Sequence, residues 1–100
     1  MSTPRPLAES FSKHGHTYRQ RIRKGFVAIF EVLMGTRLLG FEVVQIRIAP
    51  EAKLPGGKTA PVREVYPSDE EFGRKGWYFM KNQETDAVNR FDSLTHGQAV

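Results

Sequence analysis

The 100-residue sequence contains no cysteine. This absence excludes a disulfide framework, a thiol nucleophile and any cysteine-based zinc or iron–sulfur site, and it fits a reducing compartment. Long apolar runs are also missing, since none approaches the roughly 18–20 residues that are needed to span a bilayer. Residues 1–12 hold no apolar stretch that could serve as the core of a signal peptide. We therefore expect a cytoplasmic protein that makes no contact with a membrane.

Recognisable catalytic patterns are scarce as well. No G-x-S-x-G motif surrounds any serine, and the glycine turn at residues 54–58 lacks the P-loop pattern. His14 and His16 could share a metal ion, but no third ligand lies near them in the sequence. Asp69, Glu70 and Glu71 follow Ser68, and a helix-capping box explains the serine and the last glutamate without chemistry. We predict no enzyme activity, no catalytic residue, no metal site and no cofactor.

The length and composition fit one globular domain. Hydrophobic residues make up 39% of the chain and charged residues 26%, which lies in the ordinary globular range. Residues 1–15 carry prolines and small polar residues without periodicity, so we expect a flexible N-terminal tail there. We expect a single domain over residues 16–94 and a frayed end over residues 95–100.

Three segments have the periodicity of strands. Residues 16–23 alternate strictly, residues 26–33 are apolar on both faces, and residues 38–48 follow after a glycine turn. Short turns between them predict an antiparallel meander with residues 26–33 in the middle. Residues 76–80 are short and aromatic, and they predict an edge strand.

The second half of the chain is less regular. Residues 49–67 hold four of the six prolines, and a segment of this kind is normally functional or mobile. Asn82 could cap a final helix over residues 83–93, with Ala87, Val88, Phe91 and Leu94 as its buried stripe. The predicted fold class is α+β, with a three- to four-stranded antiparallel meander and one C-terminal helix packed on it.

Basic charge is concentrated near the N-terminus. The net charge is +4, and residues 1–25 hold six basic side chains against the single carboxylate of Glu9. Alternation places Arg19, Arg21 and Arg23 on one face of the first strand, about 6.5–7 Å apart. Such spacing suits backbone phosphates. The candidate contacts to a nucleic acid or an acidic partner are Arg19, Arg21, Arg23, Lys24 and Arg47.

Purely structural roles remain open as alternatives, both for these arginines and for the aromatic residues. The arginines could simply solvate the outer face of an edge strand and discourage edge pairing. The aromatic residues Tyr66, Trp77, Tyr78 and Phe79 could stack on bases or anchor a protein partner, or they could be the large side chains of the core. We expect Trp77 and Phe91 to lie in the core.

Residues 66–77, Y-P-S-D-E-E-F-G-R-K-G-W, carry a resemblance to a known group of proteins. Small uncharacterised proteins of phages and prophage-bearing bacteria have a similar Y-P-S-x-E-x-[WF]-G-x-x-G-[WF] block between a three-strand meander and a closing helix. The similarity covers residues 14–92 and carries no catalytic residues. It implies a phage-related accessory or inhibitor protein.

The sequence therefore predicts a small, non-enzymatic binding protein. The leading expectation is a phage-related protein that acts on a host protein or on a protein–nucleic-acid complex. The alternative is a nucleic-acid-binding domain that uses the basic face of its first strand. The partner is thus an unidentified protein or a nucleic acid.

Overall fold

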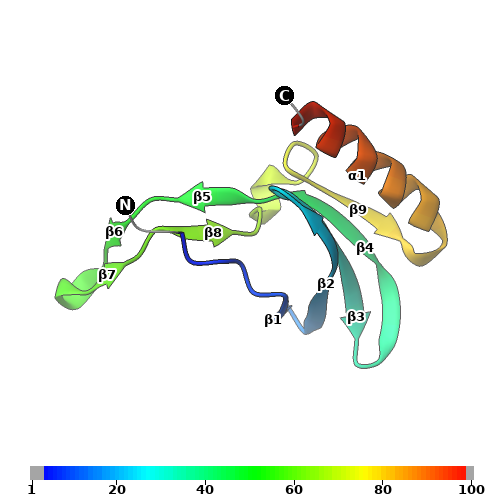
Figure 1. The fold of residues 1–100 in the computed structure, drawn as a ribbon. Coiled ribbons are helices and arrows are strands. Elements are labelled where there is room, and N and C mark those ends of the chain that lie inside the picture. Colours follow the sequence, from blue (N-terminus) through cyan, green and yellow to red (C-terminus); the bar gives the residue numbers. More distant parts are fainter. Residues whose placement is uncertain (1–3, 99–100) are drawn as a thin grey trace.

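The computed structural model describes residues 4–98 of the chain. Five strands form one antiparallel sheet in the order β1-β2-β3-β4-β9, and a single helix, α1, lies against it (Figure 1). These elements are β1 (Ser10–Lys13), β2 (His16–Lys24), β3 (Val27–Met34), β4 (Arg37–Gln45), β9 (Gly76–Met80) and α1 (Glu84–Gln98). The predicted α+β class is confirmed, and the sheet has one strand more than expected.

Both faces of the sheet are apolar, which explains why β3 lies in the middle. Residues of β3 that alternate along the strand enter two separate cores. One core holds Tyr18, Ala28, Phe30, Val32, Val44 and Ile46. The other, on the helix side, holds Val27, Ile29, Phe41, Val43, Ala87 and Phe91. A strand that is buried on both faces is thus central in the sheet, as its sequence predicts.

Helix α1 covers one face of the sheet through Ala87 and Phe91, which are 1% and 5% exposed. Val88, expected in the same stripe, is half-exposed instead. The helix is longer than predicted, because Thr95 is buried and its hydroxyl donates a hydrogen bond to the Asp92 carbonyl. Residues 95–98 are therefore helical, and residues 99–100 of the expected frayed end lie outside the described range.

The start of α1 also differs from the expectation that Asn82 caps it. A 3₁₀ turn, Lys81–Gln83, runs directly into the helix. The Met80 amide donates a hydrogen bond to Oε1 of Gln83 at 2.9 Å, so a side chain from inside the turn satisfies the first free amide. Within residues 4–98, no helix is long and apolar enough to cross a membrane.

The opposite face of the sheet carries a cluster of aromatic rings. Phe11 stacks on Tyr18 with 5.2 Å between the ring centroids. Tyr66 meets Phe30 edge to face at 5.1 Å, and it meets Phe11 in the same way at 5.2 Å. Such pairs add to the free energy gained from burial alone. The long segment after the meander therefore returns to close this face of the sheet.

Strand β1 corrects the expectation of a loose tail over residues 1–15. His14 and Gly15 both have positive φ, at 54° and 79°, and Lys13 pairs with His16 on either side of them. Two such residues form the tight turn whose twist suits a hairpin. This turn folds residues 10–13 back onto β2 and brings Phe11 into the aromatic cluster, although the tail itself has little apolar content. Residues 1–3 lie outside the described range.

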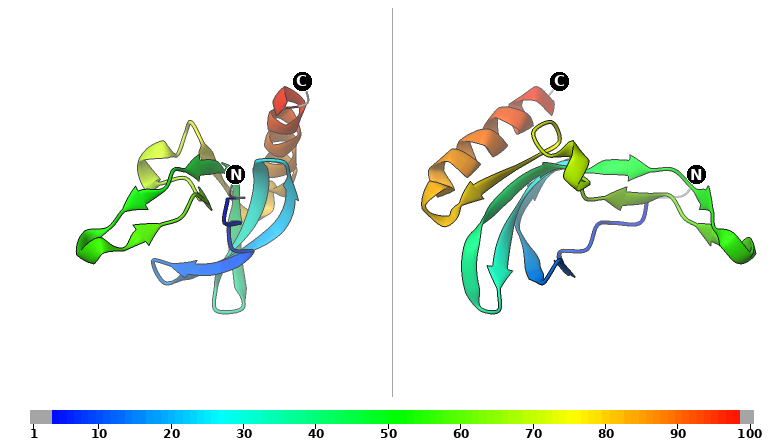
Figure 2. Two further views of the ribbon diagram at one scale, coloured as in Figure 1. Left: turned by 60° about the vertical axis from the view of Figure 1, so that its left-hand side comes forward. Right: turned by 180° about the vertical axis from the view of Figure 1, so that it is seen from behind.

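Residues 47–65, which we call the arm, project from the sheet as a two-stranded ribbon (Figures 1 and 2). The arm contains two ladders, one between β5 (Arg47–Ala49) and β8 (Arg63–Val65), the other between β6 (Ala52–Lys53) and β7 (Thr59–Ala60). Paired residues keep the same register in both ladders, so the arm is a single hairpin. Pro50 and Pro61 interrupt it because proline cannot donate to a ladder.

The arm divides the strand expected over residues 38–48. Strand β4 ends at Gln45, the Ile46 amide donates to the Phe26 carbonyl at 2.7 Å, and β5 begins at Arg47 with β8 as its new partner. After the arm, a 3₁₀ turn at Asp69–Glu71 returns the chain to the sheet. The predicted capping interaction is present there, since the Ser68 amide donates to Oε1 of Glu71 at 3.0 Å.

Candidate binding surface

The predicted row of arginines on strand β2 is broken. A β-bulge lies between Gln20 and Ile22, so Arg21 is an extra residue in the ladder. Arg19 lies opposite Glu31, on the helix side of the sheet, whereas Arg23 lies opposite Ala28, on the other side. Strict alternation in the sequence gave no sign of this bulge. The three arginines therefore do not share one face.

Arg19 and Arg21 both have carboxylate partners on the helix side. The guanidinium of Arg19 binds Oε1 of Glu31 at 2.9 Å. Arg21 forms an ion pair with Glu84 at the start of α1 and lies 5.3 Å from the centre of the Phe41 ring. These two side chains are thus used to fasten β2 to β3 and to the helix.

Arg23 joins the sheet to the arm. Its two terminal nitrogens donate to the two carboxylate oxygens of Glu64, both at 2.7 Å, which is the bidentate geometry of a strong ion pair. Oε1 of Glu64 also accepts a hydrogen bond from the Leu7 amide at 2.9 Å. The Arg23 hydrogen bond holds the pKa of Glu64 below its usual range, and the same bond raises the pKa of Arg23. Arg23 is therefore a structural clamp at the base of the arm.

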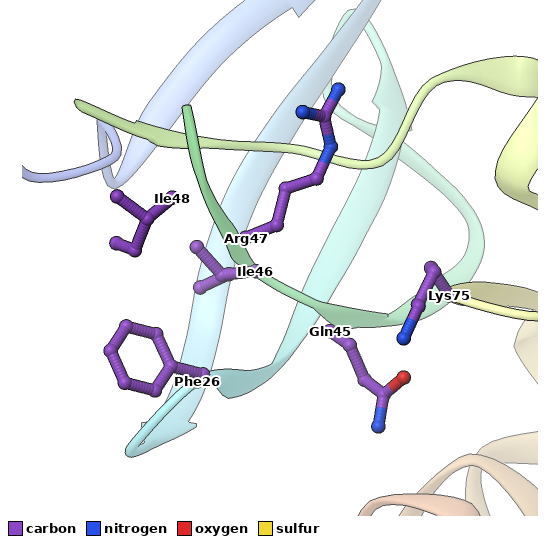
Figure 3. A pocket seen from close by; sticks show the side chains of 6 residues that line it. All are labelled: Phe26, Gln45, Ile46, Arg47, Ile48 and Lys75. Atoms are coloured by element: carbon purple, nitrogen blue, oxygen red, sulfur yellow. The ribbon is translucent and has the colours of Figure 1, made fainter. Parts of the chain in front are cut away.

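An apolar hollow of about 310 Å³ lies beside this clamp (Figure 3). Phe26, Ile46 and Ile48 form its apolar wall, and the cationic side chains of Arg47 and Lys75 stand at its edge. Phe26 and Ile48 are 47% and 39% exposed, which is high for residues of this size. Two further predicted residues belong to this region, because Arg47 opens β5 and Lys24 ends β2 just before Phe26. Arg47 also lies 3.4 Å from Oε1 of Glu71.

Beyond the hollow, the arm carries cations that the sequence analysis did not single out. Within residues 4–98, no ion pair involves Lys53 or Lys58, and both are exposed. Arg63 pairs with Ala49 on the opposite strand. Paired residues point to the same face, and so do residues an even number of positions apart on one strand. Arg63 therefore lies on the same face of the ribbon as Arg47 and Lys53. The sequence signal for this hairpin is the Gly56-Gly57 pair with a proline on either side, Pro50 and Pro61, since two glycines favour a tight turn between two strands.

The aromatic residues divide between core and surface. Tyr66 belongs to the aromatic cluster, and Phe91 is buried as predicted. Trp77 is only half-buried, with the Arg90 guanidinium 4.9 Å from its ring centre, and Phe79 packs at the edge of the helix-side core. Tyr78 is 47% exposed. The core therefore takes some of these rings, and the edge strand presents the others to solvent.

The histidine pair, His14 and His16, lies at the turn between β1 and β2. Nε2 of His14 lies 3.8 Å from a carboxylate oxygen of Asp69, but no group of three or more potential metal ligands comes together among residues 4–98.

Comparison with known proteins finds no family model, no curated protein and no solved structure that matches this chain.

Proposed function

We propose that this chain is a non-enzymatic binding protein that holds duplex DNA with its arm. The observation that carries this proposal is a contrast in pairing. The arginines of β2 are bound to carboxylates, whereas Lys53 and Lys58 near the tip of the arm have no ion-pair partner among the described residues. Cations without a partner on a projecting element are available to phosphates.

The shape of the arm supports a duplex as the ligand. The major groove of B-form DNA admits a two-stranded β-ribbon, while the corresponding groove of an RNA helix is too deep and narrow. Residues 47–65 contain four cationic side chains and two carboxylates, and one of these, Glu64, is already bound to Arg23. The tip offers Leu54, which is 47% exposed, and Pro55 as apolar contacts with the floor of the groove or with base edges.

The salt dependence of duplex binding tests this proposal. Three phosphate contacts from Lys53, Lys58 and Arg63, which form no ion pair among the described residues, correspond to a log–log slope of about −3. The double variant Lys53→Gln/Lys58→Gln should flatten this slope by about two, since each lost cation releases one counterion fewer. The measurement is the fluorescence anisotropy of a labelled duplex at several salt concentrations.

The matched control neutralises two cations on the body of the protein. Arg19→Gln/Arg21→Gln removes the same charge, but these side chains are held by Glu31 and Glu84 on the helix side of the sheet. We expect this variant to keep the parent slope. A slope that flattens equally in both variants, or a parent that does not bind the duplex at low salt, would overturn the proposal.

A protein partner is the second candidate, and the hollow at the base of the arm favours it. An apolar wall of Phe26, Ile46 and Ile48 beside Arg47 and Lys75 suits an apolar side chain that lies next to a carboxylate on a partner. The resemblance to phage and prophage proteins makes a host protein, or a host protein–nucleic-acid complex, the natural target. Under this alternative, Ile48→Asp abolishes binding to the partner, and Lys53→Gln/Lys58→Gln leaves it unchanged.

A further inference from the structure

A second hollow, of about 250 Å³, lies on the face of the sheet opposite the helix. Its lining includes Glu42 of β4, and this residue is only 9% exposed. Glu42 lies opposite Phe30, whose side chain is fully buried in the core. Placing a carboxylate at such a position is unfavourable unless a specific interaction compensates for the lost hydration. A buried carboxylate breaks the ordinary pattern of an apolar core, and such exceptions are typical of functional sites.

The protein satisfies only part of this carboxylate. The Tyr66 hydroxyl donates a hydrogen bond to Oε1 at 2.6 Å. Burial raises the pKa of Glu42, while the Tyr66 hydrogen bond and nearby Lys13 act in the opposite direction. No buried side-chain oxygen or nitrogen among the described residues lacks a hydrogen-bond partner. The structure shows no such bond for the second oxygen, so this atom keeps some contact with solvent, and Glu42 lines the hollow.

Aromatic rings form the walls around this carboxylate. Tyr18, Phe72 and Tyr78 line the same hollow. Tyr78 lies opposite Glu42 in the β4–β9 ladder, and a Cβ built on Gly40 would meet the Tyr78 hydroxyl. The glycine thus leaves room for this ring to lie beside the hollow. Aromatic faces attract cations, and this attraction grows when the cation is partly desolvated.

The ammonium group of Lys13 lies at the rim of the hollow. Nζ of Lys13 lies 3.4 Å from Asp69 and 5.6 Å from the centre of the Tyr66 ring. Lys13 lines the hollow and acts on Glu42 through its charge as well, but its ion pair is with Asp69, and no ion pair joins a cation to Glu42 among the described residues. At the floor itself, the carboxylate of Glu42 repels a free anion. A hard metal ion is disfavoured because it requires about six or more oxygen ligands.

We propose that this hollow binds an alkylammonium group, with Glu42 as its charge partner and Tyr18, Phe72 and Tyr78 as its aromatic walls. The ligand is the end of a lysine side chain from a partner polypeptide or a free aliphatic amine, since both present the same chemistry. The site is separate from the arm and does not depend on duplex binding.

An NMR titration of the ¹⁵N-labelled protein tests the proposal with n-butylammonium chloride, at constant ionic strength. We expect saturable shifts at the amides of Gly40, Glu42 and Tyr78, and at least tenfold weaker binding of the neutral analogue n-butanol. The variant Glu42→Gln should lose at least tenfold in affinity. It should nevertheless fold with an unchanged or higher Tm, because the amide oxygen can still accept the Tyr66 hydrogen bond without a buried charge.

Two further variants keep the test decisive. Glu31→Gln removes a carboxylate that faces the helix side and binds Arg19, so it should leave n-butylammonium binding unchanged. Tyr78→Ala removes a ring that is 47% exposed, and it should weaken binding at least threefold. If Glu42→Gln does not fold, the Tyr78→Ala result decides. Shifts that do not saturate, or equal affinities in parent and both site variants, would overturn the proposal.

Two additional probes distinguish the sources of the ligand. Spermidine represents free amines, and the peptide Gly-Gly-Lys-Gly-Gly represents a lysine side chain of a partner. Tighter binding of the peptide assigns the hollow to a protein partner, and tighter binding of spermidine assigns it to a free polyamine. Binding of neither probe, together with no binding of n-butylammonium, contradicts the inference.

Discussion

The body of the molecule, which consists of the five-stranded sheet and α1, and the arm are stabilised in different ways. The body has two apolar cores, one on each face of the sheet. The arm has no core of its own, and residues 50–59 are all exposed. A two-stranded hairpin is marginally stable by itself in water. The arm therefore depends on the polar contacts at its base, and its outer part adds no buried apolar surface to the fold.

The base of the arm is held from two sides. Arg23 binds Glu64 from the sheet. On the other side, Arg5 adds a short parallel bridge to Arg63, in which the Arg5 amide donates to the Val62 carbonyl at 2.9 Å and the Glu64 amide donates to the Arg5 carbonyl at 2.8 Å. The N-terminal segment thus serves as a third strand at the base. The tip has no comparable support.

The largest expected effect is in the body. Phe30→Ala removes a fully buried ring from the aromatic cluster and should lower the free energy of unfolding by about 3–5 kcal/mol. Urea denaturation measures this change. Ile48→Ala is the control in the arm, where the side chain is 39% exposed, and its effect should be much smaller. Equal losses would mean that the arm shares the core of the body.

A smaller effect is expected where the body is closely packed at its edge. A Cβ on Gly40 would collide with the backbone oxygen of Phe79, which cannot move without shifting β9. Gly40→Ala should therefore destabilise the protein by about 1–3 kcal/mol. Ser12→Ala, on exposed β1, is the control and should change the free energy of unfolding by less than about 0.5 kcal/mol. A neutral Gly40→Ala variant would show that β9 is loosely attached.

The clamp at the base of the arm should affect local opening more than global stability. Glu64→Gln removes the charge from the Arg23 pair, so the amides of β5 and β8 should exchange with solvent about tenfold faster, which corresponds to about 1.4 kcal/mol. Hydrogen exchange of the same sample should show β3 unchanged. If β3 and the arm lose protection together, the two regions unfold as one unit.

The same clamp should respond to pH. The Arg23 hydrogen bond lowers the pKa of Glu64 in the folded protein, so its stabilising contribution is fully present above the unfolded value of about 4.3. This contribution is lost as the pH falls through the lowered folded pKa. Exchange in β5 and β8, corrected for intrinsic rates, should therefore be constant from about pH 5 to 7 and rise below about pH 4. Glu64→Gln should abolish this rise, and a rise that persists in the variant would assign it to another group.

The body could be predicted from the sequence better than the arm. Alternating apolar residues such as Phe30 and Ile29 fixed the central strand, because burial on both faces leaves a periodic signal. The bulge at Arg21 leaves none, since an extra residue changes the pairing of a strand and not its composition. Strand β1 depends on positive φ at His14, which is uncommon for a residue other than glycine. The arm depends on pairing across a proline-rich segment that has no apolar pattern.

The candidate binding residues, too, could be predicted from the sequence only in part. The sequence indicated a basic surface, but it could not show that Arg19, Arg21 and Arg23 meet carboxylates from distant segments. Such pairs form only when the chain is folded. For the same reason, the cations at Lys53 and Lys58 became notable only when the ribbon that carries them was seen to project from the body.

The most direct test of the division between body and arm is to shorten the arm. A variant in which residues 51–61 are replaced by Asn-Gly keeps β5, β8 and the Arg23–Glu64 clamp and forms a short hairpin turn. We predict that its free energy of unfolding lies within about 0.5 kcal/mol of the parent, while its affinity for a labelled 20-base-pair duplex at low salt falls at least tenfold. Parent-like affinity in this variant, or a collapse of its stability, would contradict the account.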